Sequence, residues 1–225
     1  MKKGLLLFNI SILLFSYSFA QTMPDKKYTY LALGDSYTIG ESVSTEDNFP
    51  FQTVKLLRKE GYVFQEPTIV AKTGWTTDEL QRGIRKVSLE KEYSVVSLLI
   101  GVNNQYRGRT LDEYAKHFEE LLKQSIQYAG NNVNHVFILS IPDWGVTPFA
   151  EGRDRIKIAR EIDAFNEAAK KLAAVYKVHY VEITTGSREA LNDDSLLAED
   201  KLHPSGKEYF RWAQKLVTAI APELK

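Results

Sequence analysis

Residues 93–100 have the sequence YSVVSLLI, which is apolar at nearly every position. A strand with one face in water would alternate apolar and polar side chains. A continuous apolar run of this length instead predicts a strand that is covered on both faces. Such strands occur mainly in parallel sheets that carry a layer of helices on each side. This segment therefore favours a three-layer α/β/α sandwich.

The sequence on either side of this run supports the same architecture. Short apolar segments predict strands at residues 28–33, 62–70, 93–100, 135–141 and 178–183. Helical spacing and N-terminal capping signals predict helices at residues 50–60, 76–87, 110–129, 154–176 and 205–220. This alternation predicts an α/β domain with a parallel sheet of about five strands. Ligands of such sheets bind beyond the carboxyl ends of the strands, so the loops there are the candidate site.

The composition excludes several classes of site. The chain has 225 residues, no cysteine and a formal net charge of zero. Disulfides, thiolate metal sites and cysteine nucleophiles are therefore impossible. No basic stripe suggests a nucleic-acid partner, and neither glycine-rich nucleotide-binding motif is present. No spacing of His, Asp and Glu is typical of a metal site, so we expect neither a metal nor a cofactor.

The first 20 residues have the pattern of a secretory signal peptide. Two lysines at positions 2 and 3 precede a mostly apolar run over residues 4–15, and small residues stand at positions 18 and 20. The alternative is a membrane anchor, but the run is short of the roughly 20 residues that a span needs. We expect cleavage after Ala20, a domain over residues 21–225 with no stable membrane span, and a periplasmic or secreted protein.

The polar motifs of the chain supply the parts of a nucleophilic site. Ser36 follows the first predicted strand, where it can act as a nucleophile if a base takes its proton. His203 is the natural base. Asp200 lies three residues earlier, so that a turn can bring its carboxylate to the imidazole. Three nearby carboxylates are alternatives for that role: Asp193, Asp194 and Glu199.

Acyl transfer also needs donors for the developing oxyanion. The backbone N–H groups of Ser36 and Gly74 and the side-chain amide of Asn103 are suited to this task, because all three follow predicted strands. Glycine at position 74 lets the backbone approach a substrate closely. Asp35 is expected to order the turn through backbone hydrogen bonds rather than to take part in chemistry.

Together these motifs resemble the four blocks of the SGNH, or GDSL, hydrolases, in the same order. The blocks are GDS at residues 34–36, the isolated Gly74, GVN at residues 101–103 and DKLHP at residues 200–204. The resemblance implies a flavodoxin-like fold, a catalytic triad of Ser36, Asp200 and His203, and an oxyanion hole formed by Ser36, Gly74 and Asn103.

The resemblance extends to one branch and shows two departures. The segment GDSYTIGE at residues 34–41 is most similar to the bacterial periplasmic thioesterase and lysophospholipase branch. The family often has leucine where this chain has Tyr37, and usually has aspartate where it has Asn104. Neither departure removes a catalytic group, but both bear on substrate specificity.

Aromatic side chains are predicted to line the substrate site. Trp75 adjoins Gly74, and Trp144 and Phe149 lie in the loop after the fourth predicted strand. They suit an apolar wall for an acyl chain or a platform for a sugar ring, unless they only pack the loop itself. The basic stretch at residues 153–160 either attracts anionic substrates or is a solvated helix face.

The predicted function is that of a serine esterase or acylhydrolase, similar to a lipase or lysophospholipase, which forms an acyl-enzyme intermediate. Its substrate is then a small ester, a lipid or an acylated carbohydrate. A carbohydrate O-acetyl esterase and an O-acyltransferase would use the same triad, and a non-catalytic binding module is the remaining class. The sequence does not indicate an oligomeric state.

Overall fold

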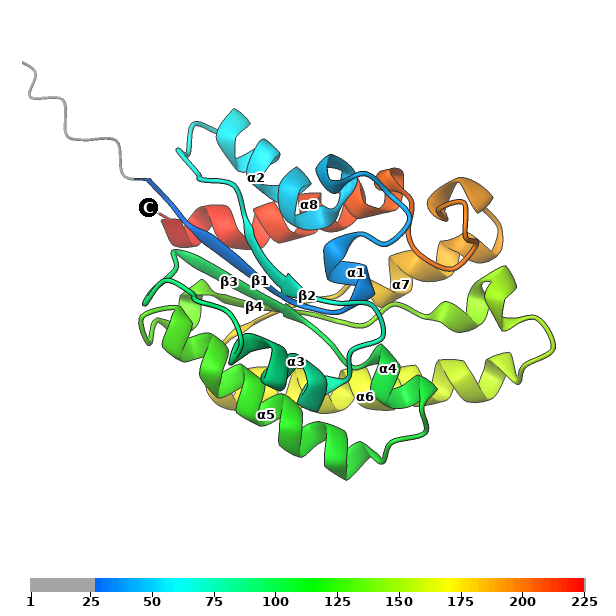
Figure 1. Cartoon of the computed structure of the whole chain (residues 1–225). Coiled ribbons are helices and arrows are strands. Elements are labelled where there is room, and N and C mark those ends of the chain that lie inside the picture. Colours follow the sequence, from blue (N-terminus) through cyan, green and yellow to red (C-terminus); the bar gives the residue numbers. More distant parts are fainter. Residues whose placement is uncertain (1–26, 225) are drawn as a thin grey trace, which may run out of the picture.

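A five-stranded parallel sheet forms the middle layer of the molecule (Figure 1). The computed structural model describes residues 27–224, so the predicted signal peptide lies outside the described residues. The strands are β1 (Tyr30–Gly34), β2 (Thr68–Ala71), β3 (Val95–Leu99), β4 (Val136–Leu139) and β5 (His179–Val181). Their order across the sheet is β2-β1-β3-β4-β5, and every neighbouring pair is parallel. The predicted three-layer α/β fold is confirmed.

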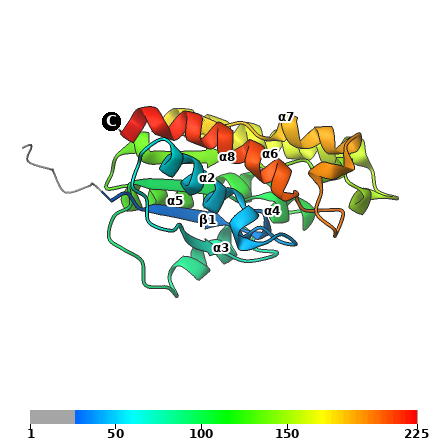
Figure 2. The ribbon, with the colours of Figure 1, turned by 90° about the horizontal axis from the view of Figure 1, so that it is seen from above.

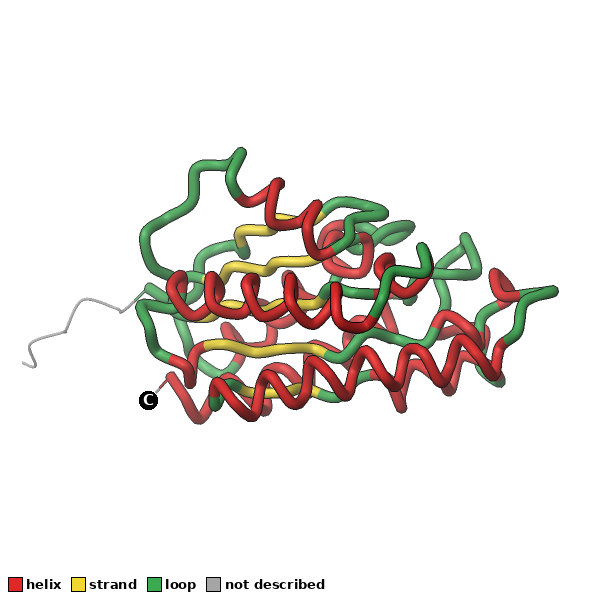
Figure 3. Tube along the Cα trace, turned by 90° about the horizontal axis from the view of Figure 1, so that it is seen from below, coloured by secondary structure: helices red, strands yellow, loops and turns green. Residues whose placement is uncertain are grey.

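Helices cover both faces of this sheet. They are α1 (Ser36–Ile39), α2 (Phe49–Lys59), α3 (Thr77–Ile84), α4 (Val102–Tyr106), α5 (Leu111–Tyr128), α6 (Arg155–Tyr176), α7 (Thr184–Ser187) and α8 (Gly206–Ile220). Helices α2 and α8 pack together on one face, which is seen from above in Figure 2. Helices α3, α5 and α6 cover the other face, and the view from below shows the long helices lying against the strands (Figure 3).

The strand order places a switch point between β1 and β3. The chain leaves β1 for β2 on one side and then returns to β3 on the other, which is where open α/β sheets bind ligands. Gly34 at the end of β1 pairs with Leu99 of β3 and with Ala71 of β2. The segments that follow these three strands therefore leave the sheet side by side.

The central strand, β3, is covered on both faces, as its apolar sequence predicts. All five residues of β3 are buried, as a continuous apolar run predicts. β1 is buried to the same extent. The hydrophobic core thus extends to both faces of the sheet and gives the loops at its carboxyl edge a rigid base.

The second predicted strand, residues 62–70, is wrong in its first half. Only Thr68–Ala71 is a strand, and the preceding segment meets the residues before β1 at an isolated bridge between Tyr28 and Phe64. Pro67 has no N–H to donate, which ends regular pairing. Arg58 also donates two hydrogen bonds to the carbonyl of Phe64, at 3.0 and 2.8 Å, so a helix side chain satisfies this backbone group.

Candidate active site

Ser36 begins the short helix α1 immediately beyond the end of β1. The Asp35 carboxylate caps this helix by accepting a 3.0 Å hydrogen bond from the amide of Tyr37, as expected for a residue that orders the turn. Gly34 makes the tight turn possible. A Cβ at this position would lie 2.0 Å from Oγ1 of Thr38 and 2.5 Å from the carbonyl oxygen of Leu99.

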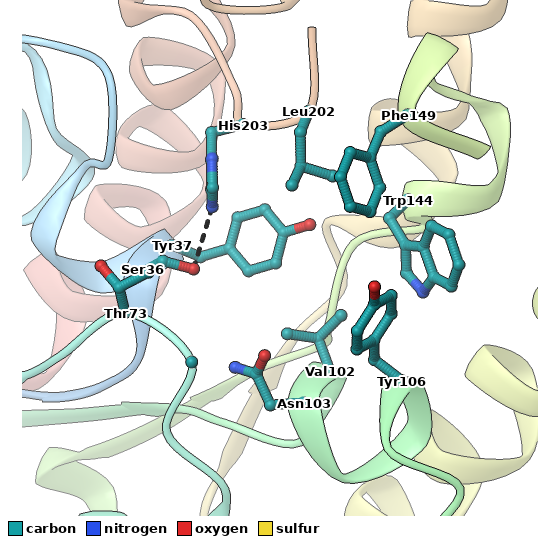
Figure 4. Close-up of a pocket in the computed structure, with 11 residues that line it drawn as sticks. Ser36, Tyr37, Thr73, Val102, Asn103, Tyr106, Trp144, Phe149, Leu202 and His203 are labelled. Atoms are coloured by element: carbon teal, nitrogen blue, oxygen red, sulfur yellow. Dashed lines mark hydrogen bonds between the residues drawn. The ribbon is translucent and has the colours of Figure 1, made fainter. Parts of the chain in front are cut away.

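A continuous chain of hydrogen bonds joins the three predicted catalytic residues. Nε2 of His203 lies 2.9 Å from Oγ of Ser36, and Nδ1 of His203 lies 2.6 Å from Oδ2 of Asp200 (Figure 4). An imidazole that donates from Nδ1 to a carboxylate presents an unprotonated Nε2 to the serine hydroxyl. Ser36 and His203 are 5% and 7% exposed, so this contact is largely shielded from water.

The turn around Asp200 fixes its carboxylate. Oδ1 accepts hydrogen bonds from the backbone amides of Leu202 and His203, and Oδ2 accepts from the hydroxyl of Ser42 at 2.6 Å. Partial burial opposes ionisation of Asp200, but these bonds and the one from the His203 ring outweigh it and lower its pKa to about 2. Asp200 is therefore ionised at neutral pH.

Two of the three alternative carboxylates, Asp193 and Asp194, have other partners. Asp193 accepts from the amide and hydroxyl of Ser195 and pairs with Lys207. Asp194 lies 3.6 Å from the ammonium of Lys201. Of the candidates that the sequence left open, only Asp200 has a hydrogen bond to the imidazole among the described residues.

Gly74 and Asn103 lie at the same cavity as Ser36. Gly74 has a positive φ of 81°, a backbone conformation that favours glycine, and its carbonyl accepts a 2.5 Å hydrogen bond from Arg107. The amide nitrogen of Asn103 donates to the carbonyl of Trp75 at 3.0 Å and more weakly to Asp35 at 3.4 Å. These contacts fix the Asn103 carboxamide in the wall of the cavity.

Asn104, one of the two departures from the family pattern, faces away from the cavity. Its side chain is fully buried and makes two hydrogen bonds to Thr77: it accepts from the amide at 3.0 Å and donates to the hydroxyl at 2.9 Å. Thr77 is the first residue of α3 and lies three residues beyond Gly74. Asn104 therefore ties the loop that carries Gly74 to the helix that carries Asn103.

Burial alters the acidity of Asp35. Its side chain is fully buried, which raises its pKa to about 7, although hydrogen bonds from the Tyr37 amide and the Asn103 side chain act in the opposite direction. A carboxyl group that titrates near neutrality is thus in contact with the predicted oxyanion donor Asn103.

A cavity of about 190 Å³ opens beside Ser36 and His203. Most of its wall is aromatic or aliphatic, as Figure 4 shows. Its lining consists of Ser36, Tyr37, Thr73, Gly74, Val102, Asn103, Tyr106, Trp144, Phe149, Leu202 and His203. The residues that carry the predicted nucleophile and the three predicted oxyanion donors therefore line one common cavity.

Three rings form the side of the cavity away from Ser36. Tyr106, Trp144 and Phe149 contact one another with ring centroids 5.3 to 6.2 Å apart. The guanidinium of Arg153 lies over all three, 5.2 to 5.8 Å from their centroids. Trp144 is buried and donates to Gln105, whereas Phe149 is 43% exposed. The rings thus pack against one another and also line the site.

The remaining aromatic prediction does not match the cavity. Trp75 is absent from the lining and packs on α3, where a Cβ added to Gly83 would lie 2.1 Å from its ring. Tyr106 was missed, although it stands three residues after Asn103 and so about one helical turn away. Arg153, from the basic stretch, contacts the aromatic wall, and it is exposed, as are Arg155, Lys157 and Arg160 of the same stretch.

Neither a membrane helix nor a metal centre is found in the described part of the chain. Within residues 27–224, no helix has both the length and the apolar character needed to cross a bilayer. The same residues contain no group of three or more His, Asp or Glu side chains arranged to hold a metal ion.

A family model described as "GDSL-like Lipase/Acylhydrolase family" matches residues 32–209. No curated protein sequence matches the chain significantly. The match spans the predicted nucleophile, the three oxyanion donors and the Asp–His pair.

The fold is similar to that of several solved structures. TesA is 20% identical, with a TM-score of 0.67, over 87% of this chain and 99% of TesA. The psychrotrophic esterase EstA from Pseudoalteromonas sp. is 18% identical, with a TM-score of 0.66, over 88% and 98% of the two chains. Axe2, an acetylxylan esterase from Geobacillus stearothermophilus, is 19% identical, with a TM-score of 0.67, over 86% and 94%. At these identities the likeness shows the fold alone.

Proposed function

Because the chain belongs to the GDSL-like lipase/acylhydrolase family and is thus a serine hydrolase of ester bonds, we propose that Ser36, His203 and Asp200 are its catalytic triad. The observation that carries this proposal is the unbroken hydrogen-bond chain from Asp200 through the imidazole to the Ser36 hydroxyl. A serine that only stabilised a turn would need neither a buried imidazole nor an ionised carboxylate behind it.

In the first half of the reaction, Nε2 of His203 takes the proton of the Ser36 hydroxyl while Oγ bonds to the ester carbonyl carbon. The carbonyl π electrons move to its oxygen, which becomes the oxyanion. When the tetrahedral intermediate collapses, the bond from carbon to the alcohol oxygen breaks, and His203 gives its proton to that oxygen. The alcohol leaves, and the acyl group stays on Ser36.

Three donors are proposed to hold the oxyanion: the amides of Ser36 and Gly74 and the side chain of Asn103. One hydrogen of the Asn103 amide is committed to the carbonyl of Trp75 at 3.0 Å, while the other makes only the 3.4 Å contact with Asp35. An oxyanion in the cavity would compete with that weaker contact for the Asn103 amide. Donors that are already in place stabilise the developing charge with little reorganisation.

In the second half of the reaction, His203 takes a proton from a water molecule, whose oxygen attacks the acyl carbon. The acid leaves Ser36, and His203 returns the proton to Oγ. Asp200, which is ionised because its pKa is lowered to about 2, stabilises the imidazolium in both halves. If a sugar hydroxyl took the place of water, the same steps would transfer the acyl group to it.

The proposed substrate is a carboxylic ester. The remaining candidate functions differ in the alcohol part of that ester or in the group that accepts the acyl group. A lipase-like or lysophospholipase-like enzyme, a carbohydrate O-acetyl esterase and an O-acyltransferase all fit the triad. The apolar cavity favours an acyl group beside the rings of Trp144 and Phe149. We also propose export to the periplasm or the medium, on the signal-peptide pattern of residues 1–20.

The decisive experiment compares the wild type with Ser36→Ala on p-nitrophenyl acetate. Hydrolysis should fall by about 10³-fold or more, because the nucleophile is lost, and a fluorophosphonate probe should label only the wild type. Ser44→Ala is the matched control, since Ser44 is an exposed serine of the following loop that bonds only to Asp47. Hydrolysis by Ser36→Ala at the wild-type rate would refute the proposal. Adding a sugar acceptor and looking for acylated product tests the transferase alternative.

A further inference from the structure

Tyr37 lies beside the catalytic residues without belonging to the triad. It is the second residue of α1 and only 3% exposed, and its ring centroid is 5.3 Å from that of His203. In Figure 4 the ring extends behind the contact between Ser36 and His203. Its hydroxyl end points toward the space between Leu202, Phe149 and Trp144. The ring therefore lines the cavity between the pair of Ser36 and His203 and the aromatic wall.

A second, smaller cavity of about 20 Å³ lies next to the catalytic one. The two cavities share three lining residues, Tyr37, Trp144 and Leu202. The second is bounded elsewhere by residues that include Leu196 and Leu197. Tyr37 and its two neighbours thus form the partition between the two spaces, and the Tyr37 ring is the part of that partition closest to the nucleophile.

The charged groups at the second cavity are already paired. The carboxylate of Asp143 accepts a 2.9 Å hydrogen bond from Arg188. One oxygen of Glu208 accepts a 2.8 Å hydrogen bond from the indole of Trp212, and the other lies 3.0 Å from the guanidinium of Arg211. An apolar group that entered this space would therefore not face an unpaired carboxylate.

The hydroxyl of Tyr37 makes no hydrogen bond to another residue within the range 27–224, and its oxygen is not fully buried, because the side chain borders the cavity. Burial, together with the charges of Asp35, Asp143 and Asp200, raises the pKa of this phenol far above its usual value. The group therefore stays neutral at any working pH. The contacts that Tyr37 makes with His203 and Trp212 are contacts of its ring, with centroid distances of 5.3 and 6.3 Å.

We propose that Tyr37 limits the length of the acyl group that the cavity accepts. The enzyme then prefers esters of short acyl groups, from acetyl up to butyryl, over esters of longer ones. This inference rests on the proposed function, in which the acyl group bonded to Ser36 lies in the catalytic cavity. That cavity, about 190 Å³, is below the roughly 300–1,000 Å³ usual for small-molecule pockets. The Tyr37 ring closes the way to the second cavity.

The test measures kcat/KM for p-nitrophenyl acetate, butyrate, hexanoate and octanoate. For the wild type, kcat/KM for octanoate should be at least about ten-fold below kcat/KM for acetate. The methylene groups that do not fit in the cavity weaken binding of the transition state. Tyr37→Leu should raise the octanoate-to-acetate ratio by about ten-fold or more. Tyr37→Phe is the matched control, since it removes only the hydroxyl and should keep the wild-type ratio.

Active-site titration with a fluorophosphonate corrects each rate for the fraction of folded enzyme. If Tyr37→Leu does not fold, Leu202→Ala opens the same partition from its other side, while its backbone amide still reaches Asp200. An unchanged ratio in the folded variants overturns the inference, as does a wild type that prefers octanoate. Absence of any Ser36-dependent hydrolysis, on every ester, instead contradicts the proposed function. A second series keeps the acetyl group and varies the length of the alcohol. If Tyr37→Leu changes the preference in that series instead, the cavity binds the alcohol side of the ester, and the inference is overturned.

Discussion

Ser42 donates a 2.6 Å hydrogen bond to Oδ2 of Asp200, the same oxygen that accepts from the imidazole of His203. The two residues are 158 positions apart, so this bond joins the loop after the nucleophile to the loop that carries the base. It holds the carboxylate from the side opposite the backbone amides of Leu202 and His203. The loop that follows α1 thus takes part in positioning the triad.

Ser42→Ala is expected to lower kcat/KM for p-nitrophenyl acetate by about 2- to 10-fold at pH 8, the range for loss of one exposed hydrogen bond. The pKa of Asp200 should also rise from about 2 toward the ordinary aspartate value, since one of the bonds that lower it is gone. Ser44→Ala is the control, because Ser44 lies in the same loop and bonds to Asp47 instead. Equal losses in the two variants would mean that the loop, and not the bond to Asp200, is responsible.

The Asn103 side chain supplies the oxyanion donor that mutation can remove most cleanly. Asn103→Ala should reduce kcat by about 10²–10³-fold and change KM much less, because the donor acts mainly in the transition state. Steady-state kinetics on p-nitrophenyl acetate give both values, and the thermal unfolding midpoint shows whether the variant is folded. A folded variant with a raised KM and a wild-type kcat would place Asn103 in substrate binding only.

The sequence predicted those features that depend on local pattern. The apolar run of β3, the turn that carries Ser36 and the spacing of Asp200 and His203 are each contained in a few consecutive residues. The wrong first half of the second strand has a local cause too. Its apolar residues suggested a strand, but Pro67 interrupts the pairing.

The features that were missed depend on contacts between distant segments. The ring of Tyr106 meets Trp144 only because α4 lies beside the segment after β4, and Arg153 reaches both rings from the residues before α6. Trp75 adjoins Gly74 in the chain, yet its ring turns to α3. Neighbourhood in sequence does not decide on which side of the backbone a ring packs. Side-chain direction, and with it the substrate wall, therefore needed the structure.

Asn104 is predicted to matter for stability rather than for specificity. Asn104→Leu would leave the amide and hydroxyl of Thr77 buried without their present partner, at a cost of about 1–3 kcal/mol for each group. Chemical denaturation should show a lower free energy of unfolding. Asn104→Asp, the residue usual in the family, keeps an acceptor for the Thr77 amide, and the Thr77 hydroxyl can reverse its role and donate to the second carboxylate oxygen, so this variant should lose less stability. If both variants unfold like the wild type, the bonds between Asn104 and Thr77 do not hold the two loops together.

Asp35 should make the stability of the protein depend on pH near neutrality. Its pKa in the folded chain is raised to about 7, above the value of about 3.9 expected when unfolded. The folded chain therefore binds this proton more tightly, and the resulting stability is complete below pH 4 and is lost as the pH rises to about 7. Asp35→Asn removes this titration but keeps an oxygen that can cap α1. Thermal unfolding at pH 5 and pH 8 should show a wild-type midpoint that falls several degrees further than that of the variant. The other titrating groups are common to both proteins, so equal falls would mean that Asp35 is ionised in the folded chain at pH 5.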